Sequence, residues 1–151
     1  MPYTKIIKSV VTPTVVLTAY TAEDVVGGLL EFSLSGLSNN GGLINSAVLI
    51  DEDSQAEPYK LYIFDSLPST IADDAAFAPT VADLQKLVCV IEFAAASYVT
   101  VNTFDYCIVT DINNAFSTST GKLYGYLVAN ASTPDYANAD TLTITLRIIS
   151  E

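Results

Sequence analysis

The sequence predicts a single-domain, all-β protein, an antiparallel β-sandwich of jelly-roll or Greek-key type. Three observations predict this fold. Apolar and polar residues alternate with period two in many apolar segments, as in strands with one buried face. Polar segments rich in Asn, Gly, Asp and Pro separate these strands at short intervals. The chain has 151 residues, half of them hydrophobic, which suits one domain with its own core.

In the N-terminal third, residues 1–18 are predicted to form an arm or edge strands. The sandwich domain is predicted to follow over residues 19–151. Pro13 divides the arm, because proline cannot donate to a strand ladder. SNNGG at 38–42 supplies residues that tolerate positive φ in a turn. The strands expected in this third are 6–11, 14–17, 29–34 and 44–50.

The stretch AYTAEDVVGGLLEF at 19–32 contains two adjacent glycines, which argue against a helix. Its glycines lack the G-x-G-x-x-G spacing of a phosphate loop. We therefore predict a turn that leads into a strand. Glu23 and Asp24 are expected at the solvent-exposed corner of the turn, and Gly27–Gly28 at a bend or a close backbone contact. The side chains expected to point inward are Leu30, Phe32 and Leu34.

The middle third combines a strand with helical signals. YKLYIFD at 59–65 is apolar on both faces apart from Lys60, which predicts a central strand or one that a partner covers. One or two short helices are predicted near 70–87. Ser69 or Thr70 would cap the first helix, and Pro79-Thr80 would open the second.

The C-terminal strands alternate most clearly at TLTITLRII, residues 141–149. The polar stretches at 113–121 and 130–140 are predicted loops. The remaining strands are expected at 88–93, 98–102, 106–110 and 122–129. Gly125 inside the last of these suggests a bulge or a close backbone approach.

The composition limits the function. Six basic residues face 17 acidic ones, so nucleic-acid binding, which relies on Lys and Arg at phosphates, is not expected. No apolar run reaches the length of a membrane span, and no signal peptide is expected. Cys89 and Cys107 lie in apolar strands and are predicted to be reduced, buried thiols.

We expect no enzyme, no cofactor and no metal. The chain has no histidine, so triads with a histidine base are ruled out, and no Asp is paired with a Glu by any recognisable pattern. Asp51, Asp53 and Gln55 match the first ligand positions of a calcium loop. The sixth and twelfth positions are Ala56 and Tyr62 instead of Gly and Glu, so we predict a solvated hairpin turn there.

The N-terminal arm is the candidate interaction segment. Its two lysines flank apolar residues, and they are the only basic residues before Lys60. One interpretation is an ordinary first strand. The other is an arm that adds its strand to a neighbouring acidic subunit. The candidate residues are Lys5, Ile6, Ile7, Lys8, Val10 and Val11.

Three stretches together resemble a group of small virion structural proteins of tailed bacteriophages. They are AYTAEDVVGGLLEF at 19–32, GLINSAVLIDEDSQAEPYKLYIFDSLPS at 42–69 and DDAAFAPTVADLQKLVCVI at 73–91. The resemblance implies a capsid decoration (cement) protein, a β-sandwich that is commonly trimeric and sits on the outer surface of an icosahedral head. It implies no individual functional residue.

The expected function is therefore that of a non-enzymatic virion structural protein. It would be made in the host bacterial cytoplasm, bind the major capsid protein and bridge capsomers. The mean hydropathy of +0.40 also favours a homo-oligomer that buries apolar surface between chains. The alternative is a receptor- or carbohydrate-binding module of a phage tail or head fibre, which would use exposed tyrosines and the two long polar loops.

Overall fold

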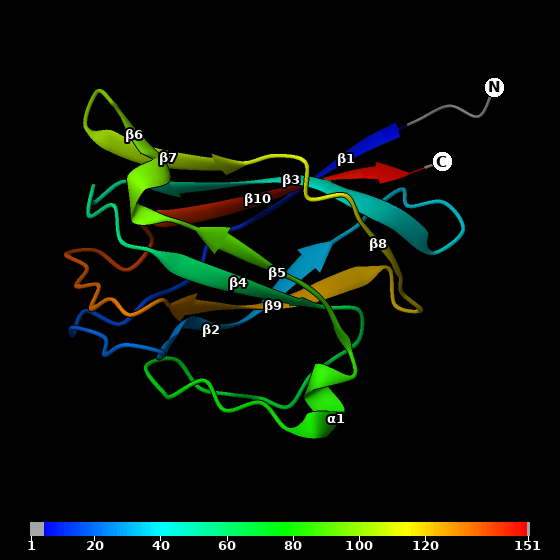
Figure 1. The fold of residues 1–151 in the computed structure, drawn as a ribbon, viewed down its shortest axis with the longest axis horizontal. Helices are drawn as coiled ribbons and strands as arrows, with labels where there is room; N and C mark the ends of the chain where they lie inside the picture. Colours follow the sequence, from blue (N-terminus) through cyan, green and yellow to red (C-terminus); the bar gives the residue numbers. More distant parts are fainter. Residues whose placement is uncertain (1–4, 151) are drawn as a thin grey trace.

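The computed structural model describes residues 5–150, and they form two antiparallel sheets packed face to face (Figure 1). The larger sheet has the order β1-β10-β3-β7-β6, and β8 pairs with β3. Its strands are β1 (Lys5–Val11), β3 (Gly41–Asp51), β6 (Tyr98–Val101), β7 (Phe104–Val109), β8 (Asn114–Ser117) and β10 (Leu142–Ser150). The smaller sheet has the order β2-β9-β4-β5, with β2 (Val25–Ser33), β4 (Tyr59–Phe64), β5 (Leu87–Phe93) and β9 (Lys122–Ala129).

The strands pair in a nested way. β1 pairs with β10, β2 with β9, β3 with β7 and β8, and β4 with β5. Successive strands β1 to β4 alternate between the two sheets, so the chain is a long hairpin rolled into a sandwich. This is the jelly-roll arrangement. The predicted all-β sandwich is confirmed.

The core lies between the sheets and is built by alternation. On β10, Leu142, Ile144, Leu146 and Ile148 are completely buried, as the sequence predicts. Each such side chain contributes about 1.5–3 kcal/mol when it leaves water. Facing them from the smaller sheet are Phe32, Leu61, Ile63, Phe93, Leu123 and Leu127.

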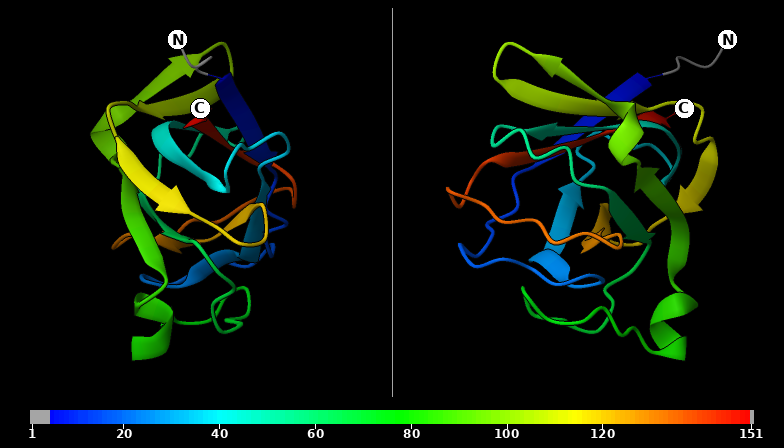
Figure 2. Two further views of the ribbon diagram at one scale, coloured as in Figure 1. Left: turned by 90° about the vertical axis from the view of Figure 1, so that its right-hand side faces the viewer. Right: turned by 60° about the vertical axis from the view of Figure 1, so that its left-hand side comes forward.

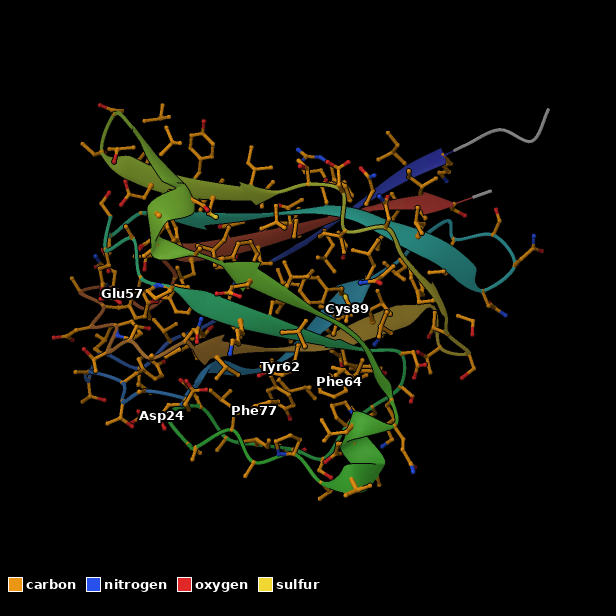
Figure 3. The ribbon with its side chains drawn as sticks, in the orientation of Figure 1. Asp24, Glu57, Tyr62, Phe64, Phe77 and Cys89 are labelled. Carbon is orange, nitrogen blue, oxygen red and sulfur yellow. The ribbon has the colours of Figure 1, made fainter. Side chains whose placement is uncertain are left out.

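Residues 65–86 form a cover on the other face of the smaller sheet (Figure 1). Figure 3 shows Tyr62 and Phe77 side by side, and their ring centroids are 4.4 Å apart. The hydroxyl of Tyr126 donates to the Ser69 carbonyl at 2.6 Å. β4 is apolar on both faces because it is a central strand and its own chain covers its outer side.

Only the second predicted helix forms. Helix α1 (Val81–Leu84) has Thr80 as its N-cap, with Asp83 completing a reciprocal capping box. The stretch before it is extended, because its backbone pairs with the residues that lead into β2. The Val25 amide donates to the Ala75 carbonyl at 2.8 Å, and the Phe77 amide donates to the Glu23 carbonyl at 2.9 Å.

The two glycines of 19–32 lie inside β2, which begins at Val25 rather than at residue 29. Gly27 and Gly28 have φ of 84° and 70°, and the register with β9 shifts between Val26 and Leu30. The Gly27 amide donates to Asp73 at 2.7 Å. The predicted bend and close backbone contact are confirmed. Asp24 is a correction, because its carboxylate is buried and accepts from the Thr21 amide at 2.9 Å.

Three other details differ from expectation. Residues 14–17 form no strand. Residues 114–117, predicted as loop, form β8. The 51–58 turn is not a hairpin, because β3 and β4 belong to different sheets. The pairing of a short polar strand depends on where the β3 edge lies, which local sequence does not reveal.

Candidate interaction surface

One face of the larger sheet points away from the core, and within residues 5–150 Figure 1 shows no other element over it. We call it the exposed sheet face. Cross-strand partners fix which side chains share it: Lys8 with Arg147, Thr145 with Val48, Val48 with Ile108, and Val99 with Tyr106. It extends from β1 at one edge of the sheet to the β6–β7 hairpin at the other (Figure 2).

Hydrophobic side chains dominate this face. Ile6 is 67% exposed, Val101 54%, Val10 51% and Ile108 48%. A monomeric soluble protein rarely leaves so many large apolar side chains together in water. Near the β6–β7 end they surround a shallow hollow lined by Val48, Ile50, Val101, Phe104 and Tyr106.

Two positive charges stand directly opposite each other on this apolar background. Lys8 on β1 and Arg147 on β10 are cross-strand partners with exposed side chains. Like charges in that position are destabilising within the sheet. Among residues 5–150 the ion pairs are Lys86–Asp83 and Lys122–Glu31, so neither Lys8 nor Arg147 has an acidic partner there.

The end of the face where β10 begins is acidic. Glu52 and Asp140 are exposed and line a second hollow together with Asp53 and Phe104, and the Phe104 side chain belongs to the exposed sheet face. Along β10, Arg147 is five residues from Leu142, which pairs with Asp51, so roughly 17 Å separates the two ends. One face therefore carries a basic end and an acidic end, with Thr143 and Thr145 of β10 between them and exposed apolar side chains toward the β1 and β6–β7 edges.

The structure places the predicted interaction residues on two sides of β1. Ile6, Lys8 and Val10 lie on the exposed sheet face, whereas Ile7 is buried in the core and Val11 packs against it. Lys5 runs beside Gly36, its Nζ within 2.4 Å of where a Cβ would stand. β1 is an edge strand paired with β10 of the same chain over residues 5–11. Residues 1–4 lie outside the described part, and exchange of the arm between subunits remains a prediction.

Sequence reasoning missed the other half of the surface. Val99, Val101 and Ile108 lie in short predicted strands whose alternation is too brief to separate an inner face from an outer one, and Phe104, the first residue of β7, fell between the two predicted strands. A usable signal was the lack of any charged residue between Phe93 and Asp105. Natural sheets usually protect an edge strand with charge or proline.

The Asp51 carboxylate and the two cysteine thiols, which could take part in catalysis or metal binding, are buried within the fold. Asp51 is buried and accepts from the amides of Asp53 at 2.9 Å and Gln55 at 3.0 Å, and burial raises its pKa. The thiols of Cys89 and Cys107 are free and buried, as predicted, and burial raises the pKa of both. Within residues 5–150, no group of three His, Cys, Asp or Glu side chains is placed to hold a metal ion. No helix in that part is long and apolar enough to span a membrane.

Fold and surface together define a jelly-roll sandwich with an uncovered, largely apolar sheet face. Comparison of the chain with protein-family models and with curated proteins gave no match. Among solved structures, the chain is similar to a chain in the structure of turnip yellow mosaic virus at 100 K. The identity is 15% and the TM-score 0.31, over 99% of this chain and 95% of that one. A likeness at that score carries no argument about function.

Proposed function

We propose that the chain is a non-enzymatic virion structural protein of a tailed bacteriophage, a capsid decoration protein on the outer head surface. The observation that carries the proposal is the exposed sheet face. Obligate subunit interfaces are more apolar than the surface of a monomer and resemble a core cut in half. The resemblance of residues 19–91 supplies the virion setting, and jelly rolls are frequent among capsid domains.

The mechanism is mass action. A subunit that binds the assembled head, and not the separate capsomers, lowers the free energy of the assembled state alone. At a free concentration 100 times the dissociation constant, each occupied site adds about 2.7 kcal/mol. Bridging between neighbouring capsomers by the bound protein would couple them, with the major capsid protein as the partner. The negative charge of the chain, −11 at pH 7, keeps the free protein dispersed before it binds.

The test is to locate the protein on virions of the phage that encodes it. A gold label on an affinity tag is expected over the head facets in negative stain. Label confined to a tail tip or fibre would replace the proposal with a receptor- or carbohydrate-binding module. Virions without label would end the virion assignment. In parallel, heads prepared without the protein should release DNA at a higher temperature once the purified chain is added back.

A further inference from the structure

The exposed sheet face has charges of opposite sign at its two ends and exposed apolar side chains toward its β1 and β6–β7 edges, and these features complement a second copy of the same face. We propose that two chains pair through this face about a two-fold axis, in place of the trimer that the resemblance to decoration proteins implies. This deepens the proposed function by naming the partner of the surface, and it rests on that function for its setting on the virion.

Symmetry decides which parts meet. When two sheets pack face to face as an isologous pair, the two-fold axis lies between them, parallel to their planes. An axis perpendicular to the line joining the two ends places the basic end of each copy over the acidic end of the other. Lys8 and Arg147 of one chain then meet Glu52 and Asp140 of its partner, and the contact occurs twice.

The same rotation also buries apolar side chains. Ile6 and Val10 protrude on either side of Lys8, at 67% and 51% exposure. The apolar hollow lies toward the opposite, β6–β7 edge of the sheet, beside Val101 and Phe104. Both groups of apolar side chains lie inside the paired area, so pairing removes them from water together. Sheets packed in this way sit about 10 Å apart, with their inner side chains interdigitating.

The size of the face can be compared with that of a stable interface. Five strands spaced about 4.8 Å apart give roughly 19 Å from β1 to β6, and the nine residues of β10 extend roughly 30 Å. The flat outline is therefore roughly 570 Å², and the relief of the side chains raises the contact area toward the ~800 Å² per partner of a standard interface.

Pairing also gives a physical reason for the positions of the four charged side chains. Like charges opposed across a strand pair weaken the isolated chain. Opposite Glu52 and Asp140, the same two charges would be neutralised at the rim of the interface. Rim pairs steer association and fix orientation more than they add affinity. Orientation is the property that a two-fold pair of acidic proteins requires, because only one alignment of the faces avoids placing acidic ends together.

The experiment is a charge swap on the full-length chain, with the mass in solution measured by sedimentation equilibrium. Wild type at micromolar concentration is expected to have the mass of two chains. The variants Lys8→Glu/Arg147→Glu and Glu52→Lys/Asp140→Lys should each associate at least about tenfold more weakly, because like charges then meet twice. An equimolar mixture of the two variants should recover the wild-type affinity, since both contacts are again between opposite charges.

A second pair of variants tests the apolar part. Val101→Arg places a charge in the hollow and is expected to abolish pairing. Val81→Arg, on α1 far from the face and 76% exposed, should leave it intact. Circular dichroism and a melting curve on each variant separate loss of pairing from loss of folding.

Three results would overturn the inference. They are a monomeric wild type, a mass of three chains, or folded variants whose mixture fails to recover affinity. A monomer that still labels head facets would sink the pairing and leave the decoration function standing. A two-chain species that never appears on virions would do the reverse.

Discussion

Lys8 on β1 lies directly opposite Arg147 on β10, so two of the six basic residues of an acidic protein share one cross-strand position. Both side chains are exposed on an apolar sheet face and lack an acidic partner within residues 5–150. This placement is unfavourable in the isolated chain, which argues for a role outside it.

The Lys8–Arg147 pair leads to the first prediction. Lys8→Thr should raise the free energy of unfolding of the monomer by about 0.5 kcal/mol, because it removes the like-charge repulsion. Lys60→Thr is the matched control, since Lys60 faces Glu92 across β4 and β5, and its loss should be neutral or destabilising. Urea unfolding in a Val101→Arg background, where pairing is absent, measures both. Equal effects of the two substitutions would contradict the repulsion.

Gly27 is predicted to tolerate no side chain. It has φ of +84°, and an added Cβ would stand 2.4 Å from the Pro13 Cβ. Gly27→Ala should therefore cost about 3 kcal/mol, from backbone strain and overpacking together. Gly121 also has positive φ, +69°, but has nothing within 4 Å of an added Cβ, so Gly121→Ala should cost only about 1 kcal/mol. Thermal or urea unfolding compares the stabilities of the two variants. Similar losses of stability would show that the positive φ alone, and not the contact with Pro13, causes the destabilisation.

Asp83 should stabilise the cover of the smaller sheet in a pH-dependent way. It accepts hydrogen bonds from the amides of Ser69 at 2.8 Å and Thr80 at 2.9 Å, which hold its pKa well below its ordinary value of 3.8. The folded state thus binds the proton less tightly than the unfolded state. The stabilisation is complete above pH 3.8 and is lost as the pH falls through the folded pKa.

Asp83→Asn should accordingly lower the melting temperature at pH 7, and the difference from wild type should shrink in acid. The exposed Asp135, changed to Asn, is the control and should change little. A difference from wild type that persists unchanged at pH 2 would rule out the carboxylate as its cause. Limited proteolysis should also cut the 65–86 cover sooner in the Asp83 variant.

Cys89 and Cys107 should be unreactive in the folded protein. They are 8% and 0% exposed, and burial raises the pKa of both thiols, so little reactive thiolate is present. Alkylation at pH 8 is expected to be at least ~100-fold slower than in urea, because it must wait for opening of the sandwich. Mass spectrometry resolves the two sites. Rapid modification of Cys107 would show that β7 opens locally.

Much of the fold could be predicted from the sequence. Alternation at 141–149 identified β10 and the face that it buries, because a period of two is a local property of the backbone. The glycines at 27 and 28 indicated a bend for a similar reason. One of the one or two short helices predicted near 70–87 forms. The earlier of the two possible sites is extended, because the backbone of residues 74–77 hydrogen-bonds with residues 23–25, about fifty positions earlier in the chain.

The interaction surface was predicted only in part. The sequence identified Lys5 to Val11 as unusual, because two basic residues stand out in an acidic chain. It did not place Lys8 beside Arg147, almost 140 residues away, and it did not separate Ile6 and Val10 from the buried Ile7.

The sequence by itself determined the fold class, the strand alternation and the absence of histidine chemistry, since these depend on composition and on neighbours along the chain. The tertiary structure alone decided that β1 closes on β10, that residues 65–86 cover one sheet, and that the opposite sheet stays uncovered. Strand order and register join residues that are far apart in the chain. Which face is left open depends on those long-range pairings, and no local pattern encodes them.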